Sequence, residues 1–279
     1  MSELYVSPSI VVGIDGSRTA EYAALWAIDE AISRDVPLRL LAAAAPGDQE
    51  ADAAASAVRV AAAVVEANGR PLRLETQVVE GAAIPTLLAS TGSAVMICIG
   101  SVGIKQLTHH RVGSTTQALV ASANCPVAVV RSPPRRVSTD PGWVVVELDD
   151  TPESAAVLQF GVAEARLRRA PLRVLSTWQS RYTDTHDSHA VADGNRRVRA
   201  QLDRRLSQWK HHYPDLDVRP VAIHGSALNY LSKHAAEIGL VVVGAPNASS
   251  VGELLGPMGL TTLNDAECTI LVVDRQRLL

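Results

Sequence analysis

The sequence predicts an α/β protein built from two tandem, doubly wound domains, each with a five-stranded parallel sheet. Short apolar runs alternate with amphipathic helical patterns along the chain, and this alternation is typical of parallel strands covered by helices on both faces. The order of landmarks in the first half occurs again in the second half, which indicates a duplicated domain. A chain of 279 residues is long enough for two domains of ordinary size.

The first half contains the complete pattern. Its first strand is expected over 9–15, and the turn Gly16-Ser17 leads into a helix over 20–31 with an alanine-rich face at helical spacing. Further strands are expected at 38–43, 72–79, 94–99 and 127–130, and further helices at about 50–67, after Pro85 and over 113–123.

The second half repeats this order after a break. Residues 134–142 lie in a stretch rich in proline, glycine and polar residues, which we interpret as a linker between domains 1–133 and 143–279. The repeated segments include strands at 143–149, 170–175, 240–244 and 267–273 and a helix over 152–169.

Three pairs of landmarks measure the repeat: Asp149 follows Asp15, Gly244 follows Gly100 and Cys268 follows Cys125, at offsets of 134, 144 and 143 residues. Because the offset grows, the second half must contain extra residues. We expect them in the polar stretch 179–195.

Composition excludes several functional classes. The chain is 47% apolar and 20% charged with a net charge of −3, so it has no strongly basic character that would favour nucleic acid as a partner. No apolar run approaches the 18 residues of a membrane span, and the N-terminus lacks a basic segment followed by a long apolar one. We therefore expect a cytoplasmic protein.

The three cysteines, Cys98, Cys125 and Cys268, are odd in number and form no Cys-x-x-Cys pair. This pattern argues against a disulfide framework or a zinc cluster. Each cysteine lies in or beside an apolar run, so we expect buried structural thiols, with redox sensing as the alternative.

A glycine pattern follows the fourth strand. Gly100 ends an apolar run, Gly103 follows, and Gly113 precedes Ser114 and Thr115 at the start of a helix. Glycines allow backbone N–H groups to approach an anion, and a helix N-terminus adds unpaired donors and a favourable dipole. The pattern therefore predicts a phosphate site, although its spacing is neither that of the Walker A loop nor that of the dinucleotide fingerprint.

On these residues, both halves resemble universal stress protein domains, and the whole chain resembles the tandem, mycobacterial type found in actinobacteria. The resemblance rests on Val11–Ser17, on Trp26–Ala31, and on Gly100-x2-Gly103-x9-Gly113-Ser114 followed by Cys125-Pro126-Val127. It implies Rossmann-like domains that bind ATP, with Mg²⁺, at the carboxyl ends of the strands. It also implies an intramolecular pseudo-dimer, in which Val127–Val130 and Ile270–Val273 pair.

The resemblance further implies roles for individual residues. Asp15 would bind the ribose or adenine side, the backbone near Ala43 would meet the adenine, and the glycine pattern would hold the phosphates. The implied site comprises Ile14, Asp15, Ala43, Gly100, Gly103, Gly113, Ser114 and Thr115. Two simpler interpretations remain open: the glycines serve as turns, and Asp15 caps the first helix.

In the second half the pattern is degenerate. Asp149, Gly244 and Gly256 remain, whereas Pro257 stands at the position of Ser114 and so removes both a backbone donor and a hydroxyl. Asn247 stands at the position of Gly103, and Asp150 at that of Gly16. We expect weaker nucleotide binding in this half.

The function that the resemblance implies is nucleotide-dependent regulation in stress or growth arrest, with ATP as ligand and an unidentified regulatory protein as partner. Association of two tandem chains remains open. Phosphoryl transfer needs a positioned base and metal ligands, and the loop with Lys105, His109, His110 and Arg111 contains no acid. We therefore expect slow hydrolysis at most, with an ATPase or nucleotidyl-transfer enzyme and a nucleotide-free scaffold as alternatives.

The remaining polar clusters have simpler explanations. The basic run 196–205 is expected to be the solvated face of a helix. No pair of histidines has metal-ligand spacing with a convergent acid, so no metal site is predicted.

Overall fold

A computed structural model describes residues 7–101, 113–131, 141–149, 151, 154–179, 188–245 and 268–274. The chain divides into two compact units. Unit 1 comprises Met1–Pro134 and Thr269–Arg277, and unit 2 comprises Arg135–Cys268 and Leu278–Leu279.

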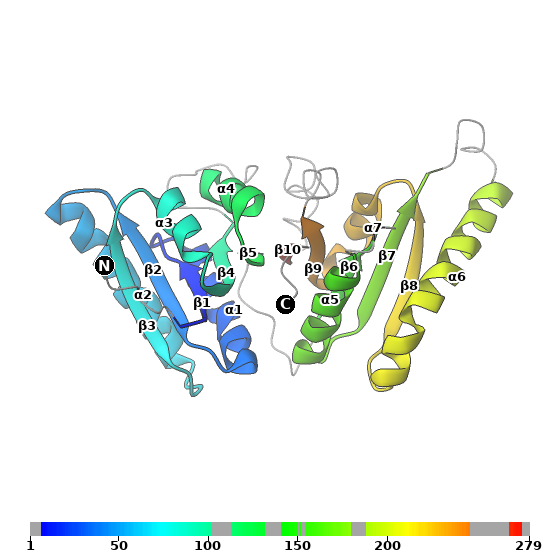
Figure 1. Ribbon diagram of the computed structural model, residues 1–279, viewed down its shortest axis with the longest axis horizontal. Helices are drawn as coiled ribbons and strands as arrows, with labels where there is room; N and C mark the ends of the chain where they lie inside the picture. Colours follow the sequence, from blue (N-terminus) through cyan, green and yellow to red (C-terminus); the bar gives the residue numbers. More distant parts are fainter. Residues whose placement is uncertain are drawn as a thin grey trace. The chain divides into compact units, whose positions relative to one another are not determined.

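Unit 1 has the strand order β3-β2-β1-β4-β5, with these five strands parallel (Figure 1). The elements in chain order are β1 (Ser9–Gly13), α1 (Arg18–Arg34), β2 (Leu38–Ala44), α2 (Asp48–Ala67), β3 (Leu74–Glu80), α3 (Ala83–Ser90), β4 (Ala94–Gly100), α4 (Ser114–Ser122) and β5 (Val127–Val130). In this order β1 lies between β2 and β4. The chain first continues to β2 and β3 on one side of β1, and then returns to β4 and β5 on its other side.

The helices of unit 1 form two pairs. Helix α1 packs against α2, and α3 packs against α4. With right-handed crossovers, this strand order puts the first pair on one face of the sheet and the second pair on the other. The predicted doubly wound α/β architecture is thereby confirmed for unit 1.

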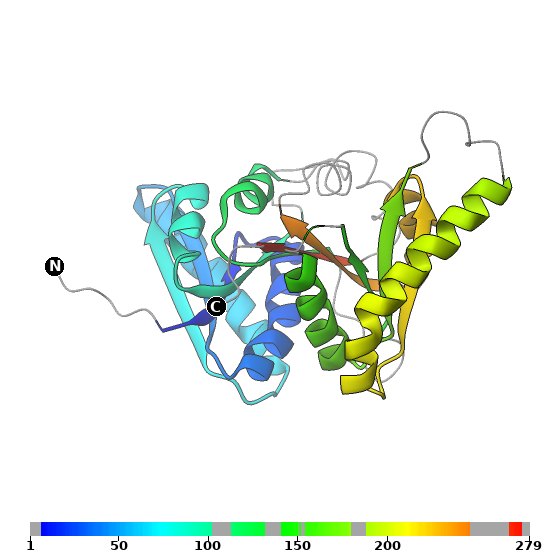
Figure 2. The same ribbon diagram turned by 45° about the vertical axis from the view of Figure 1, so that its right-hand side comes forward.

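Unit 2 repeats the arrangement with the order β8-β7-β6-β9, again parallel. Its elements are β6 (Trp143–Glu147), α5 (Ser154–Arg168), β7 (Leu172–Trp178), α6 (Ser188–His212), β8 (Val218–His224), α7 (Ala227–Lys233), the 3₁₀ turn η1 (Ala235–Glu237) and β9 (Ile238–Ala245). Helix α6 runs alongside β8 (Figure 2).

The last strand, β10 (Thr269–Asp274), belongs by its contacts to unit 1. It pairs antiparallel with β5, with Ile270 opposite Val129 and Val272 opposite Val127. The strand pairing implied by the family resemblance is therefore present. It makes the sheet mixed, because the other described ladders are parallel.

The buried strands form the core of each unit. Cys98, Cys125 and Cys268 are all buried and none is in a disulfide, as predicted. In each unit the first helix also buries a glutamate completely, Glu30 in α1 and Glu164 in α5. Each of these carboxylates pairs with the arginine one turn later, so neither charge is buried without compensation.

The extra residues of the second half were expected in 179–195, and part of this stretch is helical. Ser188–Asn195 form the first two turns of α6, which has 25 residues where α2 has 20. Residues 180–187 lie outside the described part of the chain. Part of the added length is therefore helix, which continues the spacing of the buried Leu202 and Leu206 toward the N-terminus.

Within the described ranges, no helix combines the length and the apolar character needed to cross a bilayer.

Candidate functional site

A pocket of about 780 Å³ opens in unit 1 at the carboxyl ends of β1, β2 and β4. The pocket lies beside β1 and β4, whose following connections run in opposite directions along the sheet. Ligands usually bind at this point in open α/β sheets. The lining of the pocket includes Gly13–Ser17, Leu41, Ala43, Ala44, Glu50, Leu87, Ile99, Gly100 and Gly113–Thr116. The volume falls in the range of small-molecule sites.

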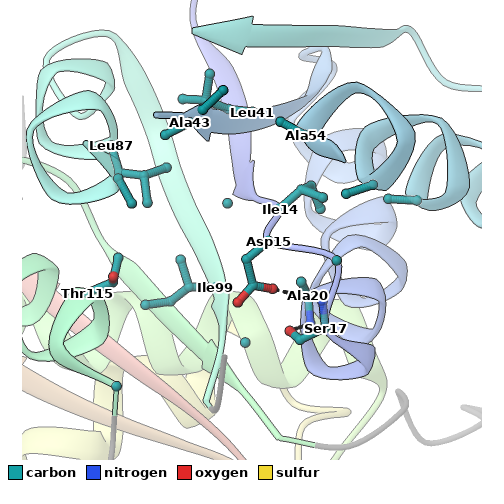
Figure 3. A pocket seen from close by; sticks show the side chains of 18 of the residues that line it. Ile14, Asp15, Ser17, Ala20, Leu41, Ala43, Ala54, Leu87, Ile99 and Thr115 are labelled. Atoms are coloured by element: carbon teal, nitrogen blue, oxygen red, sulfur yellow. Dashed lines mark hydrogen bonds between the residues drawn. The ribbon is translucent and has the colours of Figure 1, made fainter. Parts of the chain in front are cut away.

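The turn before α1 forms one side of the pocket. Asp15 is exposed, and one of its carboxylate oxygens accepts a hydrogen bond of 2.9 Å from the backbone N–H of Ser17. The helix N-cap is Ser17, whose Oγ accepts from the N–H of Ala20. The suggestion that Asp15 caps the helix was therefore wrong: its carboxylate braces the turn instead. Figure 3 shows Asp15 and Ser17 on one side of the pocket and Thr115 on the other.

The end of β2 contributes open backbone groups. On the side that faces β1, the carbonyl of Leu41 accepts a hydrogen bond from the N–H of Ile14, just after the end of β1. On the side that faces β3, the carbonyl of Ala44 accepts from the N–H of Gly81. Successive residues of a parallel strand direct their N–H and C=O to alternate neighbours. Ala43 therefore directs both groups to the β1 side, where β1 has already ended at Gly13. This leaves one donor and one acceptor facing the pocket.

Gly100, at the end of β4, is required by packing. A Cβ there would lie 2.4 Å from Oγ1 of Thr19 and 2.8 Å from the backbone N of Ala20. Only glycine therefore allows the first turn of α1 to approach β4 this closely. Close packing is therefore a sufficient reason for glycine at this position, and it is a different reason from the turn considered above.

Gly113 differs from Gly100. Its backbone φ of −60° is available to any residue, and a Cβ would have Oγ1 of Thr116, at 3.9 Å, as its nearest described neighbour. It is the N-cap of α4, and no side chain of the described residues caps that helix. The first-turn N–H groups of Ser114, Thr115 and Thr116 therefore form an uncapped, partly positive helix end that lines the pocket.

The outer wall of the pocket comes from α2. Small apolar residues line it, and Glu50 and Ser56 are the polar members from this helix: the set is Glu50, Ala53, Ala54, Ser56, Ala57, Val60 and Ala61. Val60 is 50% exposed although it is a large apolar residue. Together with Ala44, this wall forms an apolar slot beside the open backbone groups of Ala43.

The structure brings together most of the residues named from the sequence. Ile14, Asp15, Ala43, Gly100, Gly113, Ser114 and Thr115 all line the pocket. Gly103 lies in 102–112, outside the described residues, together with Lys105, His109, His110 and Arg111.

The sequence interpretation missed the wall formed by α2, including Glu50. The run of alanines over 51–63 was a usable signal, because small side chains on a helix face leave room for a ligand. The described lining has three carboxylates, those of Asp15, Glu21 and Glu50, and no Lys or Arg. Among the described residues, no three Asp, Glu, His or Cys side chains converge as metal ligands.

The corresponding region of unit 2 differs in its contacts. The carboxylate of Asp149 accepts from both the backbone N–H and the hydroxyl of Thr151, at 3.2 and 2.6 Å. Arg205, which belongs to the basic run of α6, donates to the carbonyl oxygen of Asp149 at 3.0 Å and also bonds Oγ of Ser154. Arg205 thus joins α6 to the start of α5. The expectation of a solvated face holds for the other four arginines of the run, Arg196, Arg197, Arg199 and Arg204, which are all exposed.

Of the other residues named in unit 2, Gly244 is the second-to-last residue of β9 and is buried. Gly256, Asn247 and Pro257 lie in 246–267, outside the described residues. Asp150 also lies outside them.

Comparison with known proteins gives a consistent result. The model of the universal stress protein family matches residues 8–131 and 143–274. Universal stress protein Rv2028c of Mycobacterium tuberculosis is 41% identical over 288 aligned residues that cover 100% of both chains. Universal stress protein Rv2624c of the same organism is 38% identical, with 96% of each chain covered.

Two solved structures show the same fold across the chain. A universal stress protein from Archaeoglobus fulgidus superposes with a TM-score of 0.67 at 14% identity, with 96% of each chain covered. A putative universal stress protein from Pseudomonas aeruginosa gives 0.61 at 18% identity, covering 96% of this chain and 94% of the other. The chain therefore belongs to the universal stress protein family, with two of its domains in tandem.

Proposed function

We propose that unit 1 binds ATP, with Mg²⁺, and that the protein acts as a nucleotide-dependent regulator in stress or growth arrest. One observation carries the proposal: a single pocket joins the open backbone groups of Ala43 to the uncapped N-terminus of α4 across the point where the strand order reverses. A nucleotide has a flat base and an anionic tail, which are the two features that these ends of the pocket suit.

Each part of the ligand has candidate partners. The apolar slot between α2 and the end of β2 suits the base, and the carboxylate of Asp15 suits the ribose hydroxyls. The phosphates suit the first turn of α4, where Gly113 lets an anion approach the N–H groups of Ser114 and Thr115. Mg²⁺ would neutralise phosphate charge in a lining that otherwise presents carboxylates.

The regulatory part of the proposal rests on family membership and on the character of the site. Binding of ATP would favour one arrangement around the pocket, and a protein partner would respond to that arrangement. A ligand changes such an equilibrium only by its difference in affinity for the two states.

Titration of the purified full chain with Mg-ATP by isothermal calorimetry tests the binding. We expect saturable binding, and no heat with tens of micromolar nucleotide would overturn the proposal. Mass spectrometry of the protein as purified adds a second readout, because a tightly held nucleotide co-purifies.

A matched pair of variants tests where the phosphates lie. Gly113→Asp and Gly113→Asn both supply a good N-cap side chain, so both should keep α4 stable. Only aspartate adds a negative charge. We expect Gly113→Asp to bind Mg-ATP at least about tenfold more weakly than Gly113→Asn, whereas adenosine should bind both equally. Equal ATP affinities would place the phosphates elsewhere.

The enzyme alternative has its own test. Phosphate release at a rate below about 1 s⁻¹ under saturating Mg-ATP fits a binding protein, whereas faster turnover would favour an ATPase on the same site. His109→Ala and Lys105→Ala then show whether the loop between Gly103 and Gly113 takes part.

A further inference from the structure

Two backbone hydrogen bonds identify equivalent positions in the two units. In unit 1, Ile14 donates to Leu41 at 2.8 Å and Gly81 donates to Ala44 at 2.8 Å. In unit 2, Leu148 donates to Leu175 at 2.9 Å and Gly225 donates to Trp178 at 3.0 Å. Both pairs of acceptors are three residues apart on seven-residue strands. Trp178 at the end of β7 is therefore the counterpart of Ala44 at the end of β2.

The indole of Trp178 fills the space between β7 and α6. A Cβ on Gly194 of α6 would lie 2.1 Å from the ring, so glycine is required there for the ring to fit. The ring also packs against His224 at the end of β8, with a centroid distance of 4.6 Å. Its Nε1 donates to Oδ1 of Asn195, in the same turn of α6, at 2.8 Å.

Unit 1 leaves the corresponding space open. Ala44 has only a methyl group, and Ala44, Ala53 and Ala54 all line the pocket. In the first two turns of α2, Glu50 is the polar residue that lines it. Unit 1 thus retains an acceptor on the helix but lacks the flat aromatic donor that unit 2 supplies from its own chain.

We propose that Glu50 is a specificity-determining residue, which accepts a hydrogen bond from the exocyclic amine of a purine base lying in this slot. The inference rests on the proposed function of the pocket. The base takes the place that the indole takes in unit 2, with its flat face between α2 and the end of β2. Its amine then donates a hydrogen bond to the Glu50 carboxylate, as the indole N–H of Trp178 donates to Asn195 in unit 2. The preference is for a 6-aminopurine over a purine without that donor.

The test compares adenosine with purine riboside, which is identical except that hydrogen replaces the 6-amino group. Calorimetry on the full chain should give an affinity for adenosine about tenfold higher, the effect of one hydrogen bond to a charged group. Glu50→Ala should bring the two affinities within about twofold by weakening adenosine only. Glu50→Gln keeps an acceptor oxygen and should retain part of the preference.

Asp52→Asn is the matched control for Glu50→Gln. Asp52 is exposed in the same helix and does not line the pocket, so its substitution removes a carboxylate charge without touching the slot. It should leave both affinities unchanged. Equal binding of the two nucleosides by the unmodified protein, or an equal loss of both in Glu50→Ala, would overturn the role of Glu50. Failure of every nucleoside and nucleotide to bind would instead overturn the proposed function.

Discussion

A Cβ on Gly100 would lie 2.4 Å from Oγ1 of Thr19, so the end of β4 and the first turn of α1 fit together only because Gly100 has no side chain. Gly113 lines the same pocket without such a neighbour. Two glycines of one sequence pattern therefore differ: close packing inside the fold requires Gly100, whereas the described residues leave room for a side chain at Gly113.

The first prediction follows from that contrast. Gly100→Ala should lower the free energy of unfolding by about 1–3 kcal/mol, because backbone atoms of Thr19 and Ala20 must move to admit the methyl group. Gly113→Ala should change it by less than about 1 kcal/mol. Thermal and urea unfolding of the two variants measure the difference. Equal stabilities would contradict the packing argument.

The second prediction transfers the unit 2 arrangement to unit 1. Ala44→Trp should place an indole in the apolar slot and abolish binding of adenosine and ATP, while circular dichroism shows the fold retained. Ala63→Trp adds the same side chain to an exposed position of α2 outside the pocket, and should leave binding unchanged. Full affinity in Ala44→Trp would show that the base does not use this slot.

The third prediction concerns stoichiometry. In unit 2, Trp178 fills the counterpart of the slot and the Asp149 carboxylate is engaged by Thr151. We therefore expect calorimetry to give one nucleotide per chain and expect Ala44→Trp to remove it. Two sites per chain would show that unit 2 also binds nucleotide and would contradict this prediction.

The fourth prediction uses two adjacent arginines of α6. Arg205→Ala should destabilise the protein by about 1–3 kcal/mol, because it removes donors to the Asp149 carbonyl and to Ser154. Arg204→Ala removes an equal charge from an exposed side chain and should change stability by less than about 0.5 kcal/mol. Urea unfolding of both variants provides the comparison, and equal losses would show that charge alone matters.

The fifth prediction concerns alkaline pH. Burial raises the pKa of the Tyr230 hydroxyl; the guanidinium of Arg173 lowers it and the Glu237 carboxylate raises it. Since the folded-state pKa lies above the unfolded value near 10, this tyrosine contributes stability fully below about pH 10. That contribution is lost as the pH rises through the folded pKa.

Tyr230→Phe has no such proton to lose. Thermal unfolding of the two proteins from pH 8 to pH 11 should therefore show a steeper decline for the unmodified protein. Parallel declines would contradict the raised pKa.

The sequence determined the strands well where they are short, apolar and bounded by turn residues. Strand β5 was predicted at 127–130 and occurs at Val127–Val130. Helix ends were harder to predict. The short helix was expected after Pro85 but begins at Ala83, since proline is tolerated in the first turn, where its missing N–H costs no hydrogen bond.

The candidate site was predicted in part. The residues at the ends of β1, β2 and β4 and at the start of α4 were found, because the carboxyl ends of parallel strands meet at one edge of the sheet. The role of Ser17 as the helix cap was missed, because Asp15 and Ser17 both have side chains that cap helices. Only the backbone geometry distinguishes them.

By itself, then, the sequence determined the family, the duplication and the glycine pattern, since these depend on local spacing and on the order of segments along the chain. The tertiary structure alone decided which glycine packing requires, which wall α2 supplies, and that Trp178 fills in unit 2 the space left open beside Ala44 in unit 1. The physical reason is that each of these depends on distances between atoms far apart in sequence.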